Sequence, residues 1–147
     1  MGRLVLSVIA GYVAMFVGVV VSFSVLYIAM GADRAFRPGS YDASPLWLVL
    51  SFVLSFLAAL LGGVVAITVG KRAKAAKALA VFVLGLGILM AIPAVTSKVD
   101  PGPRTGHVPN FEAMQKAKQP SWVSFLNPFI GAAGVLVSAK LRRPPAL

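Results

Sequence analysis

The chain has 147 residues, of which 59% are hydrophobic and 12% are charged, whereas a soluble globular domain averages roughly 45–50% and about 25%. The formal net charge of +10 would favour nucleic-acid binding in a soluble protein, but the basic residues here flank apolar runs, so no nucleic-acid partner is expected. The absence of cysteine excludes disulfides, thiolate metal ligands and a cysteine nucleophile.

Four apolar segments are long enough to cross a hydrocarbon core, which requires about 20 residues. They cover residues 4–30, 46–69, 78–95 and 122–139. Backbone polar groups in lipid must be paired within the chain, so these segments are expected to be helices. The sequence therefore predicts an all-α polytopic membrane protein, residues 1–147, in which one transmembrane domain forms a bundle of four transmembrane helices.

The first segment is long and uncharged, and we expect it to be an uncleaved helix. A signal peptide has an apolar core of roughly 7–15 residues, and only residues 29–31 offer a poor cleavage site. The small residues Ala14, Gly18 and Ser22 recur at every fourth position, which places them on one helix face where another helix can approach closely.

The loop after the first segment carries turn and capping signals. Pro38-Gly39 is typical of a tight turn, because proline presets φ and glycine supplies a positive φ. Ser44 and Pro45 suit the N-cap and the first residue of the next helix. Asp33 and Asp42 are expected to pair with Arg34 and Arg37.

The aromatic residues of this region suit the membrane–water interface, because they have an apolar ring and, in tyrosine and tryptophan, a polar edge. Phe36, Tyr41 and Trp47 are of this kind. An ordered interfacial loop is the main prediction, and a contact site on the outer face is the alternative. The candidate residues for that contact are Asp33, Arg34, Arg37, Tyr41, Asp42, Trp47 and Trp122.

The second segment has the clearest stripe of small residues, namely Ser51, Ser55, Ala59 and Gly63. Helices in lipid associate through such stripes and through hydrogen bonds, because lipid removes the hydrophobic driving force between them. We expect the stripes to pack the four helices of one chain against each other. The alternative is that one stripe faces another membrane subunit or a second copy of the chain.

Basic residues near the ends of the segments predict the orientation. With both termini inside, the short inner segments around residues 71–77 and 140–143 carry a denser basic charge than the outer loops. All four acidic residues, Asp33, Asp42, Asp100 and Glu112, then fall outside. We therefore expect cytoplasmic N- and C-termini.

The long third loop is expected to contain a short helix over residues 111–119, capped by Asn110 and ended by Pro120. A position in the lipid headgroup region is the main prediction for this helix, and a contact surface for a partner is the alternative. His107, the single histidine, is expected to be solvated, because a metal requires three or four ligands together.

The fourth segment is interrupted by Asn127-Pro128. Asn127 is expected to donate or accept a hydrogen bond to another helix, or to cap backbone groups freed by Pro128, and a ligand or ion role is the alternative. Gly131 and Gly134 add small residues below it. None of the predicted spans contains Asp, Glu, Lys or Arg, which argues against a proton-coupled transporter or pump.

Two short stretches, residues 31–42 with Trp47 and residues 119–128 with Gly131, resemble a group of small uncharacterised four-helix bacterial membrane proteins. The resemblance implies a location in the bacterial inner membrane and implies no activity.

The sequence contains no catalytic, phosphate-binding or metal-ligand motif, so we expect neither an enzyme nor a cofactor. The first hypothesis is a non-catalytic accessory or structural subunit that packs beside other membrane proteins. A small oligomeric channel or carrier for a neutral solute is the second hypothesis. Binding of a lipid, a quinone or a pigment in a groove between helices is the third.

Overall fold

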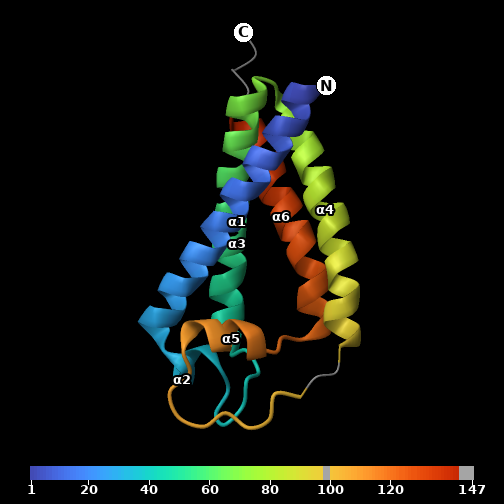
Figure 1. Ribbon diagram of the computed structural model, residues 1–147. Coiled ribbons are helices and arrows are strands. Elements are labelled where there is room, and N and C mark those ends of the chain that lie inside the picture. Colours follow the sequence, from blue (N-terminus) through green and yellow to red (C-terminus); the bar gives the residue numbers. More distant parts are fainter. Residues whose placement is uncertain (98–99, 143–147) are drawn as a thin grey trace.

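The computed structural model describes residues 1–97 and 100–142. This part of the chain is helical, with isolated β-bridges and no strand. The helices are α1 (Gly2–Met30), α2 (Ala32–Ala35), α3 (Pro45–Gly70), α4 (Ala73–Thr96), α5 (Asn110–Lys116) and α6 (Ser121–Leu141), as Figure 1 shows. Four of them, α1, α3, α4 and α6, are long and apolar enough to cross a membrane. The predicted all-α membrane bundle is confirmed.

The third and fourth spans differ in detail from their predictions. Helix α4 begins at Ala73, before the predicted apolar run, because the alanine- and lysine-rich segment that precedes the run has high helix propensity. Helix α6 continues through Pro128, so the expected interruption of the helix is not present. Gly87 of α4 leaves room for the Pro128 ring, since a Cβ at Gly87 would lie 2.6 Å from Pro128 Cγ.

The bundle has two different ends. Figure 1 shows the start of α1 and the end of α6 at one end, which we call the terminal end, and α2, α5 and the two long loops at the other, which we call the cap end. The α1 and α3 helices form one pair, and α4 and α6 form the other. The two pairs lie close together at the terminal end, and α1 and α4 diverge toward the cap end (Figure 1).

Small residues bring α3 close to both of its large neighbours. A Cβ at Gly134 of α6 would lie 2.7 Å from the Ala59 Cβ, and a Cβ at Gly63 would overlap Ser138. On the other side of α3, Gly11 and Gly62 meet so closely that a Cβ on either would lie 2.7 Å from the carbonyl oxygen of the other. These contacts hold the terminal half together without large side chains, as is usual for helices in lipid.

The first loop has the two local features that the sequence predicts. Gly39 has a φ of 68°, as the third residue of a type II turn after Pro38 requires. Ser44 caps α3 through its hydroxyl oxygen, which accepts a hydrogen bond from the Trp47 backbone N–H at 3.1 Å, and Pro45 is the first helical residue.

The short helix of the third loop is present, but its predicted boundaries and cap were wrong. Helix α5 ends at Lys116, because Lys118 has extended backbone that bridges to the first loop. Asn110 does not cap the helix. It is the first helical residue after Pro109, and its side-chain amide donates a hydrogen bond to Ser24 Oγ of α1 at 2.9 Å.

Candidate functional site

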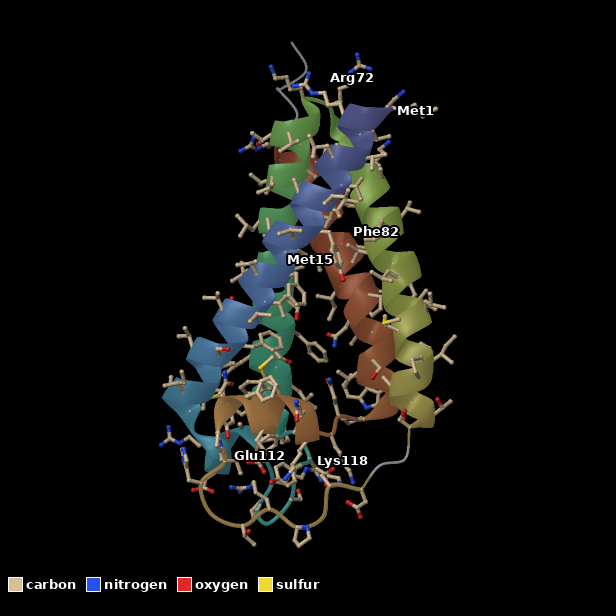
Figure 2. The ribbon with its side chains drawn as sticks, viewed as in Figure 1. Met1, Met15, Arg72, Phe82, Glu112 and Lys118 are labelled. Atoms are coloured by element: carbon tan, nitrogen blue, oxygen red, sulfur yellow. The ribbon has the colours of Figure 1, made fainter. Side chains whose placement is uncertain are left out.

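A cavity of about 510 Å³ lies between the helices and is bordered by α5 at the cap end. It lies between the α1–α3 pair and the α4–α6 pair, and the loop segments of the cap end close it from below in the view of Figure 2. Its volume falls within the range of roughly 300–1,000 Å³ that is typical of small-molecule sites. We treat this cavity as the candidate functional site.

The deep end of the cavity is closed where the helix pairs converge. The Tyr12 ring of α1 meets the Phe82 ring of α4 edge to face, with centroids 5.3 Å apart. Beside this pair, a Cβ at Gly131 would lie 3.0 Å from Val83 Cγ1 and 3.1 Å from Met15 Cε, so these side chains leave little space. Figure 2 shows Met15 and Phe82 at this level. The terminal half beyond is packed, and the cavity therefore belongs to the cap-end half.

Aromatic and thioether side chains line part of the cavity, and small aliphatic and uncharged polar residues line the rest. Phe23 of α1 and Trp47 of α3 pack edge to face with ring centroids 5.8 Å apart, and Met15, Met90 and Met114 line other faces. Met90 and Met114 are 56% and 53% exposed on the outer surface. Because both also line the cavity, the cavity is not sealed at these two residues.

Polar side chains line the cavity in its cap-end half. They are Ser51 and Ser55 of α3, Ser124 and Asn127 of α6, Asn110 of α5 and Gln119 before α6. At 1.5 Å per residue, the four on α3 and α6 lie within about 15 Å of the cap ends of their helices. Tyr12 adds a phenol at the deep end. The lining from the described residues contains no Asp, Glu, Lys, Arg or His.

Some of these polar groups are already paired and others are not. Ser51 Oγ donates a hydrogen bond to the Leu48 carbonyl at 2.8 Å, and the Asn110 amide nitrogen is used by Ser24. Among the described residues, no hydrogen bond engages the side chains of Ser55, Ser124 or Asn127. The predicted bond from Asn127 to another helix is thus not present, and its amide borders the cavity instead.

The cap end that closes the cavity is an ordered unit held to α1 and α3. Its core cluster consists of Tyr27, Ala35, Phe36, Tyr41, Val108 and Ala113. The Tyr27 hydroxyl donates a hydrogen bond to the Val108 carbonyl at 2.7 Å, and both groups are buried. Phe36 and Tyr41 are therefore buried within the protein, and their predicted depth at the membrane–water interface stays a prediction.

Arg104 joins the third loop to the first. Its guanidinium pairs with the Asp33 carboxylate at 3.0 Å, its Nε donates to the Ser40 carbonyl at 3.2 Å, and it lies 6.0 Å from the centroid of the Phe36 ring. The arginine side chain is buried, but Asp33 is exposed. The predicted pairing of Asp33 with Arg34 or Arg37 was wrong, because Arg104 reaches it from a distant part of the chain.

Backbone hydrogen bonds and two lysines complete the cap end. The Lys118 N–H donates to the Tyr41 carbonyl and the Ala43 N–H donates to the Lys118 carbonyl, each at 2.8 Å. Lys118 Nζ bonds the Asp100 carboxylate at 2.9 Å, and this bond lowers the pKa of Asp100. Lys116 Nζ bonds Glu112 at 2.6 Å, which raises the pKa of Lys116.

The predicted outer-contact residues do not form one patch. Asp33, Arg34, Arg37 and Asp42 are exposed, whereas Tyr41 is buried and Trp47 lines the cavity. Asp42 makes no ion pair with Arg34 or Arg37 among the described residues. Trp122 is 55% exposed and packs against Phe52, with ring centroids 6.1 Å apart.

Most of the predicted packing residues fall into two groups. Ala59, Gly63 and Gly134 lie in the contact between α3 and α6, and Gly18 faces Ala58. Ser51, Ser55, Asn127 and Gly131 instead line the cavity. Ala14 is half-buried, and the Ser22 hydroxyl bonds to the Gly18 carbonyl in its own helix.

Sequence reasoning missed the lining residues Asn110, Met15 and Met114. Their types are ordinary for a loop and for a membrane helix, so the sequence carried no signal that they would meet.

The described residues hold no group of three or more His, Cys, Asp or Glu that could bind a metal ion. His107 is exposed and borders a shallow hollow of about 580 Å³ together with Asp33, Arg34 and Arg104. The side chains that border this hollow carry charges of both signs, and we do not treat it as a binding site.

Comparison with protein families, curated proteins and solved structures finds no match to this chain. The four apolar helices show a multi-pass membrane protein.

Proposed function

We propose that this protein binds a lipid-phase molecule, such as a lipid or a quinone, in the cavity between its helix pairs. The observation that supports this proposal is a largely apolar cavity of about 510 Å³ whose polar groups lie mostly at one end. Small-molecule sites usually have this composition. Met90 and Met114 border both the cavity and the outer surface, so a molecule dissolved in the bilayer could reach the site without crossing water.

Two other hypotheses have less support. A channel needs a path through the bundle, but the terminal half is packed around Leu79 and Val135, which are fully buried. An accessory subunit needs a free face for its partner, but the stripe residues Ala59, Gly63 and Gly134 are already occupied in packing within the chain. Assembly with other membrane proteins stays a prediction, and no catalytic role is proposed.

We further propose a bacterial inner membrane with the terminal end in the cytoplasm. Basic residues gather at that end, and all four acidic residues belong to the cap end. The basic residues described there are Arg3, Lys71, Arg72, Lys74, Lys77, Lys140 and Arg142, whereas Lys98 and Arg143 lie outside the described residues. An excess of Lys and Arg marks the cytoplasmic side.

Cysteine labelling tests this orientation, because the natural chain has no cysteine. A single cysteine at Thr105, which is exposed at the cap end, should react with a membrane-impermeant maleimide in intact cells. A cysteine at Lys74 should react only after the cells are opened. The reverse pattern would overturn the orientation.

The binding function is tested by native mass spectrometry of the protein purified in a mild detergent. The wild-type chain should retain one bound small molecule, which lipid extraction then identifies. Ser55→Phe places a large ring in the cavity and should remove that molecule. Val53→Phe is the matched control, since Val53 is exposed on another face of the same helix. Equal occupancy in both variants, or no bound molecule in the wild type, would contradict the proposal.

A further inference from the structure

The chemistry of the cavity narrows the class of its ligand. The proposed function requires only that a lipid-phase molecule binds, but lipids differ mainly in their headgroups, some of which are charged and others neutral. A headgroup meets more hydrogen-bonding groups in the cap-end half of the cavity, because the opposite end, closed by the Tyr12–Phe82 pair and by Met15, offers only the Tyr12 phenol.

Those polar groups are all uncharged. Ser55, Ser124 and Asn127 offer hydroxyl and amide groups that both donate and accept hydrogen bonds, and no hydrogen bond within the described residues engages them. A charged headgroup would lose its hydration there and would find no opposite charge in the lining. That loss is costly unless the charge is paired.

Three of the cap-end cations in the described part of the chain are already paired with carboxylates, and Arg34 and Arg37 are exposed and do not line the cavity. Lys116 is paired with Glu112 at 2.6 Å, and Lys118 is paired with Asp100 at 2.9 Å. Arg104 is paired with Asp33 at 3.0 Å. A phosphate that reached toward any of these cations would have to compete with a carboxylate of the chain.

We therefore infer that the cavity selects an amphiphile with an uncharged, hydrogen-bonding headgroup, such as the hydroxyl and ester groups of a diacylglycerol or the carbonyls of a quinone. This inference rests on the proposed function. The headgroup lies toward the cap end against Ser55, Ser124 and Asn127, and the apolar chain lies against Phe23, Met15 and the opening beside Met90. A lipid with an anionic phosphate headgroup binds more weakly.

Tryptophan fluorescence gives a direct test, because the chain has two tryptophans in different surroundings. Trp47 lines the cavity, and Trp122 is 55% exposed on α6. In a Trp122→Phe protein, Trp47 alone reports the cavity, and in a Trp47→Phe protein Trp122 alone reports nonspecific quenching. Each is titrated in detergent micelles with diacylglycerol and with phosphatidic acid that carry the same brominated chains.

We expect diacylglycerol to quench Trp47 with an affinity about tenfold or more above that of phosphatidic acid, since the unpaired phosphate charge opposes binding. Asn127→Leu, which is close in size, should lower the diacylglycerol affinity about three- to tenfold. Asn127→Lys should reverse the preference, because it supplies the missing cation.

The outcomes separate the two proposals. Equal affinities, or tighter binding of phosphatidic acid to the natural lining, would overturn the headgroup inference and leave a lipid-binding cavity. Quenching of Trp47 that does not exceed the quenching of Trp122 for either lipid would overturn the binding function as well. A Leu variant that binds diacylglycerol as well as the wild type would remove Asn127 from the headgroup site.

Discussion

Removing the hydrogen bond from Tyr27 to Val108 is the most direct test of what holds the cap end over the cavity. The Tyr27 hydroxyl donates to the Val108 carbonyl at 2.7 Å, and both groups are buried. Tyr27→Phe keeps the ring and its contact with Phe36, whose centroid is 6.2 Å away, but leaves a buried carbonyl without a partner. An unsatisfied buried group costs about 1–3 kcal/mol.

That cost should appear as easier opening of the cap end. Since about 1.4 kcal/mol is a factor of ten in an equilibrium constant, we expect amide hydrogens around residues 108–117 to exchange about tenfold faster. Hydrogen exchange followed by mass spectrometry, in nanodiscs, measures this opening directly. Peptides from the terminal half of α3 should be unchanged, because Tyr27 does not contact them.

Tyr12→Phe is the matched control. Tyr12 is also a tyrosine of α1, but no hydrogen bond from its hydroxyl to a described residue is present, and its ring packs against Phe82 in the deep end. Unchanged exchange around residues 108–117 in Tyr27→Phe, or an equal increase in Tyr12→Phe, would refute the idea that this bond holds the cap end.

Three further outcomes test packing, charge and ligand linkage. Gly134→Leu should lower the melting temperature by several degrees or prevent folding, because even a Cβ atom at position 134 would lie 2.7 Å from the Ala59 Cβ. The control is Ala133→Leu, which lies on the exposed side of the same helix and should have little effect. Lys118 lowers the pKa of Asp100 from its ordinary value of 3.8. The ion pair therefore stabilises the fold above that pH, and its contribution is lost as the pH falls through the lower native pKa. Asp100→Asn should remove this pH dependence from the amide hydrogen exchange of the cap end. Stripping bound lipid with a harsh detergent should lower the melting temperature, and adding diacylglycerol back should restore it.

The amino-acid sequence was sufficient for the elements whose formation depends on local chemistry. Long uncharged apolar runs require helices in lipid, whatever their neighbours are. The turn at Pro38-Gly39 and the cap at Ser44 also formed as predicted, because each depends on residues within three positions. The helix boundaries were less accurate where helix propensity extended α4 beyond its apolar run.

The tertiary structure decided the pairings and the cavity. Asp33 had two arginines close in sequence, but it pairs with Arg104, 71 positions away, and Asn110 bonds Ser24 instead of capping its own helix. The spacing of small residues along α3 placed Ser55 and Ala59 on one stripe, but Ser55 borders the cavity, whereas Ala59 packs against α6. The reason is that α1 and α4 diverge, so one stripe is in close contact at the terminal end and borders open space at the cap end.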